Sequence, residues 1–205
     1  MTHEFDRGYW ESHWREAAGR AAAPPHPHLD AELADLPPGT ALDAGCGEGA
    51  EARWLAARGW QVTAVDVSAE VLARAAAGAA VTDGGPGRID WLRADLSTWA
   101  PPVEHDLVTT HYAHPAMPQL AFYARVAEWV VPGGTLLVVG HRARAGDHGH
   151  GGHPDHASAT AAEVVALLDP DRWDVVTAGE PSRRVERPGR TVELHDVVVR
   201  AVRRR

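Results

Sequence analysis

The stretch "ALDAGCGEGAEARWLAARGWQVTAVDVS", residues Ala41–Ser68, places a glycine-rich loop between an apolar run and a helical pattern. Gly45, Gly47 and Gly49 fall where the predicted strand ends and the predicted helix begins. Glycines at such a junction let backbone N–H groups and the helix N-terminus approach a ligand without obstruction by side chains. The stretch therefore predicts a ligand-binding loop at the start of an α/β fold.

Three acids near this loop indicate the kind of ligand. Asp66 ends the next apolar run, where a carboxylate can accept hydrogen bonds from both hydroxyls of a ribose. Asp43, just before the glycines, suits a ligand with an ammonium group and would be unfavourable beside a pyrophosphate. Asp95, in "RADLSTW", can accept from an adenine amino group. The glycine spacing also satisfies the dinucleotide fingerprint, so a nicotinamide-dependent oxidoreductase stays open as an alternative.

The rest of the chain alternates short apolar runs with helical patterns, which predicts βαβ units and a parallel sheet. We expect about seven strands, of which the last two pair antiparallel, and we assign them to residues 40–45, 60–67, 88–95, 104–112, 135–141, 172–179 and 190–202. The helices between them are expected over 48–59, 68–78, 117–130 and 158–169. Before them, residues 5–20 predict a short helix, and the prolines after it exclude a helix before Leu29. We therefore expect an N-terminal lid or cap over residues 1–37 and one domain over 38–205.

The amino-acid composition excludes several classes of function. The 205 residues suffice for one domain, and the formal charge of −8 argues against a basic surface for nucleic acid. The chain has one cysteine and no lysine, so disulfides, a Walker lysine and Schiff-base chemistry are excluded. No apolar run approaches the roughly 20 residues of a membrane span. We expect a soluble, cytoplasmic monomer or homodimer that acts on a small molecule.

Several segments together resemble the class I S-adenosylmethionine-dependent methyltransferases, in the small-molecule branch related to tellurite-resistance methyltransferases. The opening stretch resembles the first two motifs of that family, and "RADLSTW", "HDLVTTHYAHP" and "VVPGGTLLVVGH" resemble its third, fourth and fifth. The resemblance implies a Rossmann-like, doubly wound seven-stranded sheet in the order 3-2-1-4-5-7-6, with strand seven antiparallel. It also implies S-adenosylmethionine as cofactor and S-adenosylhomocysteine as product. The methyl acceptor would be a thiol or metalloid, or an oxygen or nitrogen of a metabolite.

The resemblance also implies roles for individual residues. Asp43, Gly45 and Gly47 would hold the methionine moiety of the cofactor. Asp66 and Val67 would hold the ribose, Asp95 and Leu96 the adenine, and His111 would line the open side of the cofactor. Cys46 stands where the family commonly has a cysteine, and we interpret it as a small filler of the cofactor loop rather than a nucleophile.

The acceptor side is predicted less directly. His111 and His141 follow two central strands and are candidates for a general base, although a histidine there can also simply line a pocket. The residues that we expect to contact the acceptor are Tyr9, Trp10, Tyr112, His114, His141 and Arg142. The loop from His148 to His156 is rich in histidine, which leaves a metal-binding or sensor protein as another alternative. We expect a substrate lid there and no metal.

Overall fold

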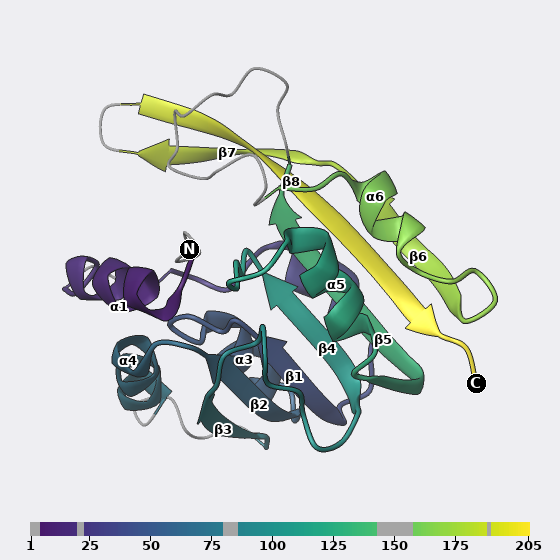
Figure 1. Cartoon of the computed structure of the whole chain (residues 1–205), viewed down its shortest axis with the longest axis horizontal. Coiled ribbons are helices and arrows are strands. Elements are labelled where there is room, and N and C mark those ends of the chain that lie inside the picture. Colours follow the sequence, from purple (N-terminus) through teal and green to yellow (C-terminus); the bar gives the residue numbers. More distant parts are fainter. Residues whose placement is uncertain (1–4, 20–22, 80–85, 143–157, 188–189) are drawn as a thin grey trace.

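The computed structural model describes residues 5–19, 23–79, 86–142, 158–187 and 190–205. Within these, the chain forms one eight-stranded sheet with helices on both faces (Figure 1). The strands are β1 (Thr40–Ala44), β2 (Gln61–Asp66), β3 (Arg88–Arg93), β4 (His105–His111), β5 (Val130–His141), β6 (Trp173–Gly179), β7 (Ser182–Arg187) and β8 (Arg190–Arg203). The helices are α1 (Arg7–Glu16), α2 (His28–Leu33), α3 (Ala50–Ala57), α4 (Ala69–Ala79), α5 (Gln119–Ala127) and α6 (Ala161–Ala166).

The sheet has the strand order β3-β2-β1-β4-β5-β8-β6. Strands β1 to β5 are parallel, and β8 is antiparallel to both β5 and β6. This confirms the doubly wound fold and the antiparallel pairing of the last two predicted strands. One strand was missed: β7 pairs with the first half of the long strand β8, and the two form a hairpin that extends beyond the sheet in Figure 1.

The core consists of two apolar layers, one on each face of the sheet. Adjacent residues of a strand enter opposite layers, as Leu107 and Val108 of β4 do. One layer receives Phe122 from α5 and residues of α6, and the other receives Leu29 from α2 and Leu55 from α3. Because helices cover both faces, the central strands are apolar on both sides, as parallel sheets require.

Local signals in the sequence set several element ends. Asp6 accepts from the Tyr9 backbone at 2.9 Å and caps α1, and the Ser68 hydroxyl accepts from the Val71 backbone at 3.3 Å at the start of α4. Helix α2 begins at His28, one residue before the expected limit. Strand β5 begins at Val130 rather than near residue 135, with an irregular register against β4. In the described part of the chain, no helix is long and apolar enough to cross a membrane.

Candidate active site

The glycine loop joins β1 to α3 in a backbone conformation that side chains rarely adopt. Gly45 and Gly47 have φ angles of 83° and 50°. The amides of Gly45 and Cys46 both donate to the Val65 carbonyl, at 2.9 Å each, which ties the loop to β2. A Cβ atom at Gly45 would lie 2.3 Å from the Cβ of Ala113. Glycine is therefore required here both by the positive φ and by the close approach of the chain after β4.

Asp66 lies at the end of β2 with both carboxylate oxygens fixed. The Gly47 amide donates to Oδ2 at 3.0 Å and the Ser68 amide donates to Oδ1 at 2.9 Å. Burial raises the pKa of this carboxyl, although these backbone donors act against the shift. The side chain is thus fixed beside the glycine loop, and its contact with the ribose of a cofactor stays a prediction.

Two further carboxylates stand near Asp66. Burial and the neighbouring Glu51 and Asp66 raise the pKa of Asp43 well above its usual range. Asp43 Oδ2 has no hydrogen-bond partner among the described residues. Burial likewise raises the pKa of Glu51, which accepts from the His26 amide at 3.0 Å. A buried cluster of acids that repel one another favours a positively charged ligand. Glu51 was missed at the sequence level, although its place in the first turn after the loop offered a signal.

A cavity of about 870 Å³ lies against the glycine loop. Its lining includes every predicted cofactor residue except Asp43: Gly45, Cys46, Gly47, Asp66, Val67, Asp95, Leu96 and His111. Asp43 is 1% exposed and does not line the cavity, so its influence on a ligand would be electrostatic and not a direct contact. The cavity has the size of a small-molecule site.

Helix α1 forms an aromatic wall of the same cavity. The wall consists of Tyr9, Trp10, His13 and Trp14, with Phe5 ahead of the helix. Glu11 fixes α1 to the start of α4, because its carboxylate accepts from the Ser68 hydroxyl and the Ala69 amide, at 3.1 Å each. The Trp10 indole N–H donates to the His114 carbonyl at 3.0 Å. Tyr9, Trp10 and His114, which we predict to contact the acceptor, thus all line the same cavity.

His111 and His141, the predicted candidates for a base, both line the cavity. Burial and the neighbouring His28 lower the pKa of His111 to about 3. Its Nδ1 lies 3.3 Å from the Thr109 hydroxyl, and its Nε2 is buried with no hydrogen-bond partner in the described part of the chain. A group with so low a pKa accepts a proton poorly at neutral pH. His111 is therefore better suited to receive a hydrogen bond than to act as a general base. His141 packs on Tyr112 with ring centroids 4.4 Å apart.

Tyr112 is the centre of a polar network that the sequence did not reveal. It has a φ of 53°, a left-handed conformation that is strained for a bulky residue and often marks functional sites. Its hydroxyl donates to Asp196 Oδ1 at 2.6 Å and lies 2.9 Å from His26 Nε2. Arg183 donates to Asp196 Oδ2 at 2.7 Å and to the Tyr112 hydroxyl at 3.3 Å. The network joins the N-terminal segment, the end of β4 and the hairpin β7–β8.

The other residues that the sequence singled out are Arg142, Cys46 and the histidines of the loop from His148 to His156. Arg142 is not among the described residues that line the cavity, and its guanidinium pairs with Glu180 at 2.5 Å, so its contact with the acceptor stays a prediction. Arg183 of β7 lines the cavity instead. Burial raises the pKa of the Cys46 thiol well above its usual value, which fits the interpretation of this residue as a filler. The loop from His148 to His156 lies outside the described residues.

Known proteins share sequence or fold with this chain. Residues 41–134 match the family model of the methyltransferase domain. This part of the chain is therefore similar to a methyltransferase domain. A trans-aconitate 2-methyltransferase of Streptomyces avermitilis is 38% identical over 122 residues, which are 56% of this chain and 44% of that protein. This chain therefore matches less than half the length of that relative.

Solved structures with this methyltransferase fold match nearly the whole chain. Magnesium protoporphyrin IX methyltransferase from Synechocystis PCC 6803, with bound S-adenosylhomocysteine, has a TM-score of 0.69 at 19% identity, over 96% of this chain and 97% of that one. TehB from Haemophilus influenzae has a TM-score of 0.69 at 16% identity, over 95% and 67%. These matches confirm the predicted fold.

Proposed function

We propose that this protein is an S-adenosylmethionine-dependent methyltransferase that acts on a small molecule. The observation that carries the proposal is that one cavity joins an acid-lined glycine loop to an aromatic wall. The loop, Asp66 and Asp95 would hold the cofactor at one end. The wall of α1 and the residues after β4 would hold the acceptor at the other.

The residues of the loop fit a cationic cofactor. S-adenosylmethionine supplies a methyl group on a positively charged sulfur, which loses its charge as the methyl is transferred. Glu51 lines the cavity, and burial raises the pKa of its carboxyl, a shift that a bound cation would oppose. Asp66 is oriented by two backbone amides, so its oxygens face a ribose without reorganisation. The chain's own part is thus to bind, orient and exclude water.

The charged residues that line the cavity indicate the charge of the acceptor. Its described lining carries the carboxylates of Glu51, Asp66 and Asp95 but only two guanidiniums, Arg7 and Arg183. Arg183 is already paired with Asp196. A polycarboxylate acceptor such as trans-aconitate would therefore be repelled. We propose instead a neutral or weakly charged acceptor with a thiol, metalloid, hydroxyl or amine nucleophile, packed against aromatic and imidazole rings.

Titration calorimetry tests the cofactor. We expect S-adenosylmethionine and S-adenosylhomocysteine to bind with one site per chain and NAD not to bind. Asp66→Ala should weaken S-adenosylmethionine binding by about 10- to 150-fold, because each hydrogen bond to a charged group contributes about 1.5–3 kcal/mol. Tight NAD binding without S-adenosylmethionine binding would identify an oxidoreductase and refute the proposal.

A substrate panel tests the acceptor class. Release of S-adenosylhomocysteine is scored for thiols, a metalloid oxyanion, phenols, amines and trans-aconitate. We expect turnover of a thiol, metalloid, phenol or amine and none of trans-aconitate. If trans-aconitate alone is methylated, the acceptor proposal fails while the cofactor proposal stands. His111→Ala and His141→Ala, run on the active acceptor, show whether either histidine contributes to the transfer.

A further inference from the structure

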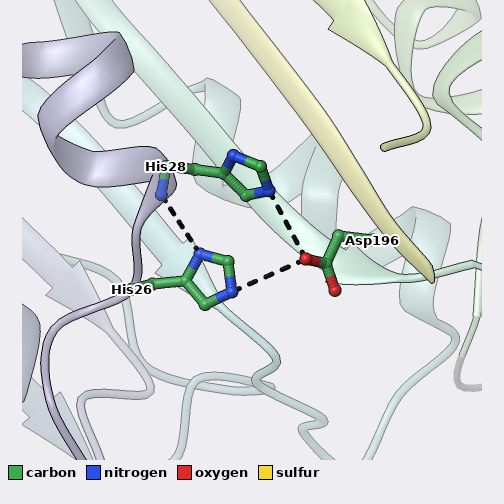
Figure 2. A group of neighbouring side chains, drawn as sticks. All are labelled: His26, His28 and Asp196. Atoms are coloured by element: carbon green, nitrogen blue, oxygen red, sulfur yellow. Dashed lines mark hydrogen bonds and ion pairs between the residues drawn. The ribbon is translucent and has the colours of Figure 1, made fainter. Parts of the chain in front are cut away.

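Figure 2 shows that the side chains of His26, His28 and Asp196 converge. His26 also lines the cavity. His26 and His28 lie on either side of Pro27 at the start of α2, and Asp196 comes from the middle of β8. Asp196 is 1% exposed, and His26 is buried. The three side chains thus join two segments that lie about 170 residues apart in the sequence.

Two of the distances between the donor atoms match a tetrahedral metal site. Asp196 Oδ2 lies 3.4 Å from His28 Nε2 and 3.7 Å from His26 Nε2. Zinc bonds of about 2.0–2.2 Å in a tetrahedron place neighbouring ligand atoms about 3.3–3.5 Å apart. The two distances to Asp196 Oδ2 thus agree with edges of such a tetrahedron to within a few tenths of an ångström, and all three donor atoms lie within 4.8 Å of one another.

One of these donor atoms lacks a hydrogen bond. His28 Nε2 is buried and has no hydrogen-bond partner among the residues that the structure describes. A buried imidazole nitrogen without a hydrogen bond is costly unless something else satisfies it. Two imidazoles and one carboxylate are also a common ligand set for zinc in proteins.

We propose that His26 Nε2, His28 Nε2 and Asp196 Oδ2 bind a divalent zinc-type cation. The fourth position is left to the Tyr112 hydroxyl, 2.9 Å from His26 Nε2, or to a molecule in the cavity that Tyr112 lines. The site attaches the N-terminal segment to β8 and stands whether or not the chain binds S-adenosylmethionine.

Arg183 competes with the cation for the same carboxylate. Its Nε donates to Asp196 Oδ2 at 2.7 Å, so it supplies positive charge where the metal would bind. The Arg183 side chain is 29% exposed and comes from the hairpin strand β7. It can therefore leave for solvent when the metal arrives, and its removal should tighten metal binding.

The test uses the chelator-treated full chain and Zn²⁺ alone, followed by calorimetry and elemental analysis. The sequence contains other histidines between His148 and His156, so the reference variant replaces His148, His150, His153 and His156 by alanine. We expect this variant to bind one equivalent of zinc. Adding His28→Ala should weaken binding by at least about 100-fold, whereas His195→Ala should not change it. His195 precedes Asp196 on β8, so its side chain points to the opposite face of the strand.

A second variant keeps the proposal falsifiable if His28→Ala destabilises the fold. Arg183→Gln in the reference variant should bind zinc several-fold more tightly, a gain that unfolding cannot produce. The proposal is overturned if the reference variant takes up no zinc, if His28→Ala binds it equally well, or if Arg183→Gln does not bind it more tightly.

Discussion

The two ends of the cavity are built in different ways. The cofactor end comes from one continuous unit, β1–α3–β2, in which Gly47 of the glycine loop and Asp66 lie 19 residues apart and are joined by a hydrogen bond. The acceptor end is assembled from α1, the segment before α2, the end of β4 and the hairpin β7–β8. A local unit can be identified from its motif, whereas an assembled wall depends on the tertiary fold. The two ends should therefore respond differently to substitution.

The largest effect is expected where the two ends touch. Gly45→Ala places a Cβ 2.3 Å from the Cβ of Ala113, which follows Tyr112 on the acceptor side. Gly19→Ala is the matched control, because Gly19 has the same φ of 83° and no atom of the described residues lies within 4 Å of its added Cβ. Both variants carry the cost of a positive φ, about 1–2 kcal/mol. Only Gly45→Ala adds overpacking, about 1–3 kcal/mol.

Denaturant unfolding of the two variants measures this difference in the free energy of unfolding. Equal losses of stability would mean that the glycine loop and the residues after β4 are not packed together as described. The two ends of the cavity would then be separate sites.

The next effect is confined to the cofactor end. Glu51→Gln keeps the hydrogen bond from the His26 amide but removes a negative charge from the cavity. We expect S-adenosylmethionine to bind about fivefold more weakly, since charged hydrogen bonds exceed neutral ones by about 1 kcal/mol. Glu48→Gln is the control, because Glu48 pairs with Arg74 at 3.5 Å and does not line the cavity. If calorimetry gives the same affinity for both variants, Glu51 does not face the cofactor.

A smaller effect is expected at the acceptor end. Tyr112→Phe removes the hydroxyl that joins His26, Asp196 and Arg183, and so loosens the wall without changing its shape. We expect the KM for the acceptor to rise about three- to tenfold, from the loss of about 1 kcal/mol of hydrogen bonding, while the affinity for S-adenosylmethionine stays unchanged.

Tyr123→Phe is the control for this variant. Tyr123 is also buried in the core but does not line the cavity. A Tyr112→Phe enzyme that loses cofactor affinity and keeps its KM would show that the division of the cavity is incorrect.

The same contrast explains what the sequence could predict. Asp66, Gly45 and Gly47 belong to one strand-loop-helix unit, so their spacing in the sequence was sufficient to predict that they lie together. Tyr112, Asp196 and Arg183 meet only because β4, β7 and β8 are brought together, and no local pattern marks them as partners. Even the positive φ of Tyr112 follows from this packing and not from its residue type.

The missed strand has a similar cause. Strand β7, "SRRVER", contains one apolar residue, Val185, and lacks the alternation that predicts a strand. It forms because β8 is long enough to pair with it beyond the sheet, from Ser182 opposite His195 to Arg187 opposite Arg190. The Pro188–Gly189 dipeptide between the two strands was a usable turn signal. Arg183 was missed for this reason, and Arg142 was chosen in its place because it follows a strong strand.

The smallest expected effect concerns strand β4, where one histidine should influence stability without influencing cofactor binding. Strand β4 has a histidine at each end: His111 lines the cavity, whereas His105 does not. Burial lowers the pKa of His105 below its usual 6.5, although Asp106 opposes the shift. The unfolded chain therefore binds a proton more readily than the folded chain. Above about pH 6.5, the pKa of His105 in the unfolded chain, this titration does not reduce the free energy of unfolding. As the pH falls from there toward the folded-state pKa, the free energy of unfolding decreases.

His105→Leu removes this titration together with a buried Nδ1 that has no hydrogen-bond partner among the described residues. We expect the variant to lose less stability than the parent between pH 7.5 and pH 5.5, measured by thermal unfolding at both values. The affinity for S-adenosylmethionine should be the same in both proteins at pH 7.5. A parallel loss of stability in the two proteins would mean that His105 is not the group that titrates. A change in affinity would mean that the amino end of β4 is coupled to the cavity at its other end.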